Sequence, residues 1–234
     1  MKKLLTILLL IPLMSFGQSE IDDLVVTGDA KLELEDYSGA IEDYTKAIEL
    51  NPEYYGAYSL RGDTKSQLED YSGAIVDYTK AIELNPEDDT YYSDRGDAKY
   101  NLEDYSGARA DYTKAIELNP EDDTYYFDRG DTKSQLEDYS GAIADYTKAI
   151  ELNPEYAYAY AMRGASKYYI DSYSSAIEDL NKAIELDPED SYSYYFRGLA
   201  KESLGYSNGA CSDWEKSAEL GDTDAATLVT ENCN

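Results

Sequence analysis

The sequence predicts an all-α protein built from repeated helix hairpins. The segment Leu68–Glu87 recurs with few changes from Leu34, Leu102 and Leu136, at a constant spacing of 34 residues. Residues 61–87 and 129–155 differ at a single position, where Val76 replaces Ala144. A period of this length is typical of an array in which each unit is one supersecondary motif, and the apolar spacing within the unit is helical.

Six repeats follow from the recurrence of one small residue. Its copies, all 34 residues apart, are Ala40, Ala74, Ala108, Ala142, Ala176 and Ala210. They set the repeats at 21–54, 55–88, 89–122, 123–156, 157–190 and 191–224. Each unit buries its apolar face against its neighbours, so no single central core is expected.

Each repeat reads as two helices separated by a short turn. In the second repeat the first helix carries Tyr58 and Gly62, and Asp70 is placed to cap the next helix. The second helix has one apolar face, made by Ala74, Ile75, Tyr78, Ala81 and Ile82. It is expected to end at Asn85, as a left-handed cap, because the following proline cannot continue a helix.

These recurring residues resemble the tetratricopeptide repeat (TPR) signature. The residues that carry the resemblance in the second repeat are Gly62, Tyr71, Ala74, Tyr78, Ala81 and Pro86. It covers nearly all of the chain after the first 17 residues. The resemblance implies a right-handed α-solenoid whose first helices line a concave groove, and a role in protein interaction rather than catalysis.

The recurring residues also predict how the hairpins are held together. Gly62 and Ala74 are expected to face each other where two helices approach closely. Tyr78 and its counterparts should fill the space between units; these are Tyr44, Tyr112, Tyr146, Leu180 and Trp214. Arg61, Lys65 and Asp77 should form a repeated ion pair, with an electrostatic binding site as the alternative. Its copies are Arg95/Lys99/Asp111, Arg129/Lys133/Asp145, Arg163/Lys167/Asp179 and Arg197/Lys201/Asp213.

Residues 1–17 read as a secretory signal peptide. Lys2 and Lys3 precede an apolar run from Leu4 to Met14, and a small-residue pattern ends at Gly17. The alternative is an uncleaved anchor, although the run is short for a membrane span. We therefore expect an exported protein, periplasmic or secreted, with no membrane attachment after cleavage.

The C-terminal end is expected to close the array. The last repeat departs from the pattern, and a capping helix with a tail is predicted over 224–234. Cys211 and Cys233 lie at similar distances on either side of the turn at Gly221, which brings them level on two antiparallel helices. We predict a disulfide between them, since disulfides persist in exported proteins.

Composition excludes several classes of function. The formal net charge is −29, with the cations spaced singly among acids, so nucleic acid is a poor partner. The chain has no histidine, which removes Ser-His triads and most zinc sites. No nucleophile and base stand out, so we expect neither an enzyme nor a cofactor or metal site. An exposed carboxylate pair in a cleft, with raised pKa values, would favour an enzyme after all.

The candidate binding residues lie on the first helices. The TPR resemblance places on the groove wall Asp63, Gln67, Asp97, Tyr100, Asn101, Phe127, Asp131, Gln135, Tyr168, Tyr169 and Tyr195. Grooves of this family that clamp a carboxylate use Lys, Arg and Asn, whereas the row that starts at Asp29 and includes Asp63 is acidic. A basic or neutral extended peptide therefore fits better. The alternative is a glycan or cell-wall module, which would need the aromatic rings at the C-terminal end to lie flat and exposed in one plane.

Overall fold

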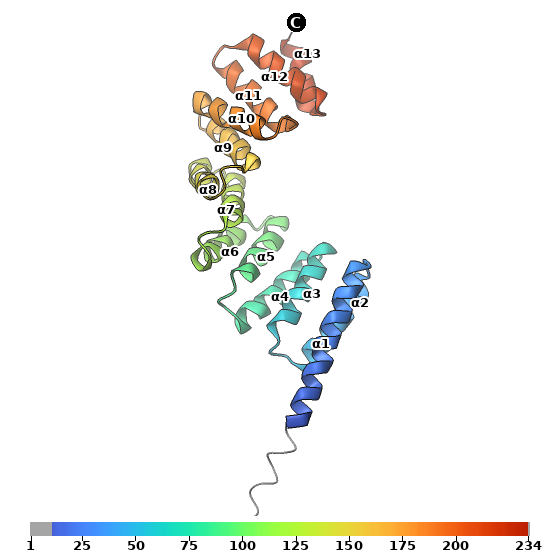
Figure 1. Ribbon diagram of the computed structural model, residues 1–234. Coiled ribbons are helices and arrows are strands. Elements are labelled where there is room, and N and C mark those ends of the chain that lie inside the picture. The colour runs from blue at the N-terminus through green and yellow to red at the C-terminus, as the bar shows by residue number, and fades with distance from the viewer. Residues whose placement is uncertain (1–10, 234) are drawn as a thin grey trace, which may run out of the picture. The chain divides into compact units, whose positions relative to one another are not determined.

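Every regular element in the described part of the chain is an α-helix, which confirms the all-α prediction (Figure 1). The computed structural model describes residues 11–233. The chain divides into two units, Met1–Leu118 and Asn119–Asn234. The first holds α1 (Ile11–Glu33), α2 (Tyr37–Leu50), α3 (Tyr55–Gln67), α4 (Tyr71–Leu84), α5 (Asp89–Asn101) and α6 (Tyr105–Leu118). The second holds α7 (Asp123–Gln135), α8 (Tyr139–Leu152), α9 (Ala157–Tyr169), α10 (Tyr173–Leu186), α11 (Ser191–Ser203), α12 (Ser207–Glu219) and α13 (Thr223–Asn232).

Within each unit, consecutive helices pair as hairpins and each hairpin packs on the next. Of the predicted signal peptide, residues 1–10 lie outside the described part, and residues 11–17 form the beginning of α1. None of the described helices is both long and apolar enough to span a membrane.

The two ends of the second helix in each hairpin differ in how well the sequence predicts them. Asp70 caps α4, because its Oδ1 accepts a hydrogen bond from the Gly73 N–H at 3.0 Å. Asn85, expected in the left-handed region, has φ −138°, so this prediction is wrong. The left-handed residue is Glu69, with φ 60°. Its counterparts are Glu35, Glu103, Glu137, Asp171 and Gly205.

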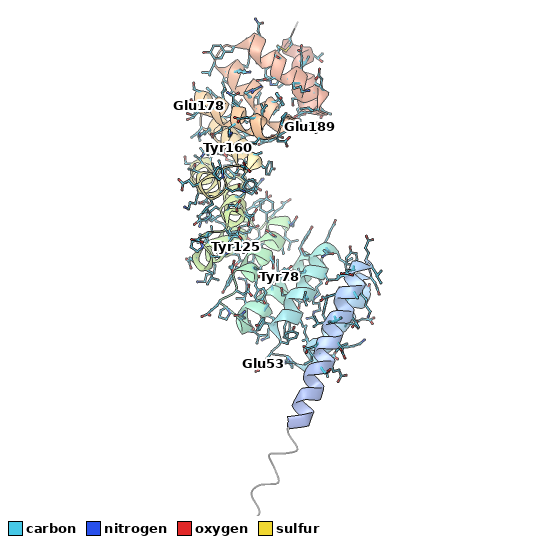
Figure 2. The ribbon with its side chains drawn as sticks, viewed as in Figure 1. Glu53, Tyr78, Tyr125, Tyr160, Glu178 and Glu189 are labelled. Atoms are coloured by element: carbon cyan, nitrogen blue, oxygen red, sulfur yellow. A yellow bond between two sulfur atoms is a disulfide. The ribbon has the colours of Figure 1, made fainter. Side chains whose placement is uncertain are left out.

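A buried ring fills the space between hairpins, as expected. Tyr78, labelled in Figure 2, is 2% exposed. It packs with Ala74 of its own hairpin and Ala98 of the next. A Cβ added at Gly62 would lie 2.8 Å from the Tyr78 ring. The glycine therefore makes room for the tyrosine ring. At the equivalent Gly164, an added Cβ would also lie 3.3 Å from the backbone oxygen of Ala176, in keeping with the predicted close approach of these two helices. Leu180 and Trp214 occupy the same place beside Gly164 and Gly198.

The predicted ion pair is confirmed in the second hairpin. Arg61 donates to both oxygens of Asp77, from Nη2 at 2.6 Å and Nε at 2.9 Å, and Lys65 donates at 2.6 Å. Asp77 is 1% exposed. Arg61 also donates from Nη1 to the Thr45 hydroxyl of the preceding hairpin at 3.0 Å, and its guanidinium lies 5.7 Å from the Tyr58 ring centroid. Asp77 thus holds the two helices of its hairpin together. It also orients the arginine that contacts the preceding hairpin.

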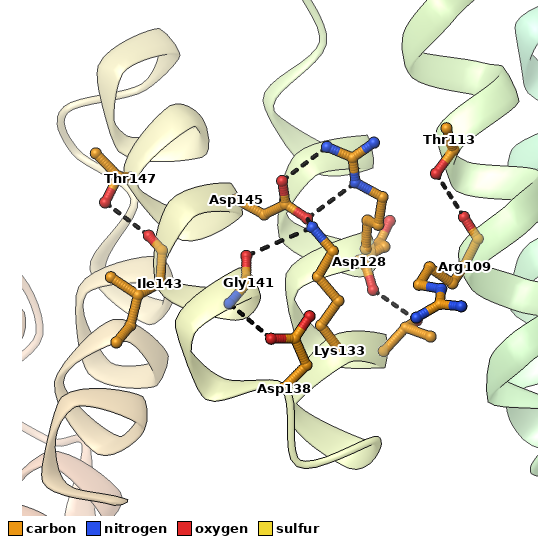
Figure 3. Close-up of polar contacts among 11 residues, drawn as sticks. Arg109, Thr113, Asp128, Lys133, Asp138, Gly141, Ile143, Asp145 and Thr147 are labelled. Atoms are coloured by element: carbon orange, nitrogen blue, oxygen red, sulfur yellow. Dashed lines mark hydrogen bonds and ion pairs between the residues drawn. The ribbon is translucent and has the colours of Figure 1, made fainter. Parts of the chain in front are cut away.

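The same pairing recurs in the other hairpins. Around Asp145, Figure 3 shows the arginine and lysine contacts together with the Asp138 cap. Bridges also join Arg95 and Lys99 to Asp111, Arg163 and Lys167 to Asp179, and Arg197 and Lys201 to Asp213. In the first hairpin Thr27 stands in place of the arginine. Asp43 accepts hydrogen bonds from the Thr27 hydroxyl and from Lys31. The alternative of an open electrostatic site is not supported, because these aspartates are buried.

The last hairpin is covered by α13. Trp214 of α12 packs against Ala225 of α13, and Leu228 and Val229 extend this cluster. Cys211 and Cys233 are paired across the two helices, with their Cα atoms 5.6 Å apart.

We expect Glu69→Gly to stabilise the protein by about 0.5 kcal/mol. Glycine relieves the strain of about 1–2 kcal/mol that an L side chain meets in the left-handed region, at some entropic cost in the unfolded chain. A urea melt measures the change. Val76→Gly is the control, since Val76 is exposed inside α4 and glycine there should destabilise by about 1 kcal/mol. A loss of stability with Glu69→Gly would show that the turn is not strained.

We expect Asp77→Ala to destabilise the second hairpin by about 3 kcal/mol, because Arg61 and Lys65 would remain part-buried without their anion. Lys65→Met should cost about 1 kcal/mol or less, since Asp77 keeps both of its arginine contacts. Hydrogen exchange of the α3 and α4 amides compares the two variants. Equal protection in both would contradict a central role for Asp77.

Candidate functional site

The acidic row on the first helices is bonded to the buried tyrosines. The Tyr78 hydroxyl of α4 donates to Asp63 Oδ1 of α3 at 2.8 Å, and the Tyr112 hydroxyl of α6 donates to Asp97 Oδ1 of α5 at 2.6 Å. The first hairpin repeats this bond between Tyr44 and Asp29. A buried hydroxyl without an acceptor is costly, so this row has a packing reason.

The residues at this tyrosine position and this aspartate position differ between the hairpins of the chain. Tyr146 and Asp131 keep the two residue types in the fourth hairpin. In the fifth hairpin the tyrosine becomes Leu180, and the residue at the aspartate position becomes Ala165. In the sixth they become Trp214 and Leu199. The acid is therefore present where a tyrosine hydroxyl needs it and absent where the hydroxyl is absent.

One carboxyl in the first unit has no such packing reason. Asp94 of α5 is partly buried, and the structure gives it no hydrogen bond or ion pair. Burial, followed by the charges of Asp63, Asp97 and Asp88, raises the pKa of Asp94 to about 7. Burial also raises the pKa values of Asp63 and Asp97, although their tyrosine hydrogen bonds oppose this. Asp97 keeps its side chain in contact with water, so a large shift is not expected there.

This acidic surface does not form an acid and base pair. Asp63 and Asp97 each accept a hydrogen bond from a tyrosine, which fixes one oxygen of each carboxylate. The pKa of Tyr78 is itself raised by burial and by Asp63, so its hydroxyl remains a donor. Within residues 11–233 no group of three or more acids or cysteines is arranged to hold a metal ion. The carboxyls of Asp63, Asp94 and Asp97 give this surface a negative potential.

The polar residues at the ends of the first helices are accessible. Gln67, Asn101 and Gln135 are exposed, and the Asn101 amide donates to the Asp97 backbone carbonyl at 2.8 Å. Tyr100 is half-buried and packs edge-on against Tyr105, with ring centroids 5.2 Å apart.

Phe127 was expected on the groove wall, but it belongs to the core of the second unit. Its side chain is 8% exposed. It packs against Tyr146 of α8, and against Tyr156 and Tyr158 at the beginning of the next hairpin, at 5.5, 5.1 and 5.2 Å between ring centroids. The burial follows because neighbouring aromatic residues of the next repeat cover it.

The tyrosines near the C-terminal end do not form a flat platform. Tyr168 and Tyr195 are half-buried and pack edge-on against Phe196, at interplanar angles of 76° and 85°. Tyr169 is 51% exposed and lies at 69° to Tyr168. It stacks instead on Tyr139 at 17°. The coplanar, exposed arrangement on which the glycan alternative depends is therefore not present.

Comparison with known families decides the identity of the repeats. A family described as "TPR repeat" matches residues 28–68 and 62–103, and one described as "Tetratricopeptide repeat" matches residues 93–157 and 127–190. Together these matches span residues 28–190. The chain belongs to the tetratricopeptide repeat family.

Solved TPR structures resemble this chain over most of its length. YrrB, described as a TPR protein with an unusual peptide-binding site, is 23% identical, with a TM-score of 0.70 over 80% of this chain and 97% of its own. MamA from Desulfovibrio magneticus RS-1 is 20% identical, with a TM-score of 0.68 over 71% and 94%. PilF of Pseudomonas aeruginosa is 16% identical, with a TM-score of 0.75 over 92% and 99%. No curated protein matches the sequence.

Our sequence reasoning missed Asp94 in this TPR protein. The same position of the repeat holds Leu60, Met162 and Phe196 in other hairpins, so an acid there breaks an apolar series. Asp128 breaks the series in the same way in the fourth hairpin. Comparing the repeats position by position would have found both acids.

We expect Asp94→Asn to stabilise this TPR protein above about pH 7. The folded-state pKa of Asp94 is raised, so the native state binds more protons than the unfolded state between about pH 4 and 7. Stability is therefore lost as the pH rises through that window, and the variant should lose less. Urea melts at pH 5 and pH 8 measure the difference. Glu87→Gln, an exposed change near the end of the second repeat, is the control; equal slopes in Asp94→Asn and the parent would contradict the raised pKa.

Proposed function

We propose that this TPR protein is an exported, non-catalytic scaffold that binds a protein or extended peptide along the first helices of its hairpins. One observation carries the proposal. The residues that recur in every hairpin are used by packing and ion pairs, whereas the first helices present accessible side chains that change from repeat to repeat. Among the latter, Tyr158 is 53% and Tyr169 is 51% exposed, and both lie on α9.

The charge of these helices favours a basic or neutral partner. The recurring lysines and arginines of α3, α5, α9 and α11 are bound to the buried aspartates. They are therefore not available to clamp a carboxylate. The chain as a whole carries a formal net charge of −29, which raises the encounter rate with basic partners at low salt. The peptide-binding site of YrrB is in keeping with a peptide partner.

Export is supported by the N-terminal sequence and by the cysteines. Lys2 and Lys3 before an apolar run, with Gly17 at the end, fit a cleavable signal. The pairing of Cys211 with Cys233 fits an oxidising compartment, where such a bond persists. In that setting the bond would tether α13 to α12 and add about 3 kcal/mol to the stability of the C-terminal end.

Two measurements test the proposal. The full chain is expressed in a bacterium with an outer membrane, and the intact mass of the protein is measured in each cell fraction. We expect a product that begins near Gln18 in the periplasm or medium, with no free thiol; a full-length product in the cytoplasm would contradict export.

Binding is tested separately with a phage-displayed random nonapeptide library panned on the exported protein. We expect enriched peptides whose amide exchange footprint falls on one or more of the first helices, α3, α5, α7, α9 and α11. A footprint confined to the second helices, or no enrichment, would contradict peptide binding on this surface. Maltoheptaose and chitohexaose, measured by calorimetry, are the glycan comparison and should give no heat of binding.

A further inference from the structure

Two exposed tyrosines lie on one face of α9 in the second unit, and we call this face, with the cavity at its Tyr158 end, the α9 notch. Tyr158, Ala161, Ala165 and Tyr169 follow one another at spacings of three and four residues, which places them on the same side of the helix. The two tyrosines are eleven residues, or about 16 Å, apart along the axis. Ala161 is 0% and Ala165 is 2% exposed, so other side chains cover the helix between the two rings, and the accessible surface on this face belongs to the tyrosines.

Each exposed ring is supported by another ring. Tyr158 packs on Phe127 of α7, and Tyr169 stacks on Tyr139 of α8 with centroids 4.7 Å apart. Tyr192 of α11 lies near both, supported by Phe196 at 4.6 Å. Side chains held in this way lose little conformational entropy when a partner binds. The notch is therefore preorganised for contact with a ligand.

The notch carries negative potential. Burial raises the pKa of the Tyr158 and Tyr192 hydroxyls, and the charges of Asp131 and Asp190 raise it further. The hydroxyls thus stay neutral. The recurring cations on α9 and α11 are Arg163, Lys167, Arg197 and Lys201, and each is bound to a buried aspartate. They do not offset the acids beside the notch.

A small cavity opens at the Tyr158 end. It has a volume of about 140 Å³ and is lined by Ala157, Tyr158, Asp187 and Asp190. Asp190 caps α11 through the Tyr192 and Ser193 N–H groups, and Asp187 accepts from the Glu189 N–H. These bonds hold both carboxylates in place beside the tyrosine ring. A cation at this point would meet an aromatic ring and two anions, and each of these attracts a positive charge.

We propose that the α9 notch binds a lysine or arginine side chain of an extended peptide. The aliphatic stem of that side chain would lie along the exposed Tyr158 ring, and its cation would enter the cavity that Tyr158 and Asp190 line. Neighbouring apolar residues of the peptide would pack against Tyr169 and Tyr192. This inference rests on the proposed function and names the chemistry of the partner for the same surface.

The experiment uses the peptides that the nonapeptide library selects on the exported protein. We expect each to contain lysine or arginine. Replacing that lysine by norleucine, or that arginine by citrulline, should weaken binding about tenfold in fluorescence anisotropy. Affinity for the parent peptide should fall steeply from 50 to 300 mM KCl, while the norleucine peptide should respond little.

Two protein variants test where on the protein the cation of the peptide binds. Tyr158→Ser removes the ring, and Asp190→Asn removes the charge while keeping a residue suited to cap α11. Each should weaken the lysine peptide about tenfold and leave the norleucine peptide nearly unchanged. Tyr206→Ser is the matched control, because Tyr206 is 62% exposed and precedes α12. Circular dichroism melts show whether each variant folds.

The outcomes separate this inference from the proposed function. Peptides that bind the first helices without a preference for a cation, or that ignore both variants, would overturn the notch assignment and leave the scaffold function intact. Absence of any binding peptide would overturn both. A loss of affinity with Tyr158→Ser and Asp190→Asn, restricted to cationic peptides, is the result that supports the inference.

Discussion

The buried aspartate of each second helix is the interaction on which the rest of the structure depends. In the second hairpin Asp77 binds Arg61 and Lys65 of the first helix, and this fixes the arginine that reaches Thr45 of the preceding hairpin. A buried anion without its cations is costly, so the hairpin angle and the stacking are set by one group. The group recurs in the other hairpins, with Thr27 in place of the arginine in the first.

This constraint decides which residues are left for recognition. The cations of the first helices are bound on the aspartate side, and the aspartates of the row that includes Asp63 are bonded to buried tyrosines. The remaining variation is an acidic surface at Asp94 in the first unit and an aromatic notch at Tyr158 and Tyr169 in the second. Each unit thus presents a different chemistry on helices of the same design.

Much of the fold could be predicted because each repeat encodes it independently. The ion pair at Asp77, the cap at Asp70 and the place of Tyr78 all follow from spacing, and the structure agrees. The left-handed prediction at Asn85 was wrong: residue preference favours asparagine there, but the junction after α4 holds it at φ −138°. The left-handed residue is Glu69, in the turn between the two helices of the hairpin. The burial of Phe127 and the tyrosine bond of Asp63 arise between helices, and spacing along one helix does not reveal them.

The most direct measurement is a double-mutant cycle on Asp63 and Tyr78, read as the free energy of unfolding. If the acidic row serves the buried hydroxyls, Asp63→Ala should cost about 1–2 kcal/mol in the parent and much less in the presence of Tyr78→Phe. The fifth hairpin already shows such a pair, with Ala165 and Leu180. If Asp63→Ala has equal effects in both backgrounds, or none in either, the acidic row does not serve the buried hydroxyls. Its aspartates would then again be candidates for contact with a partner.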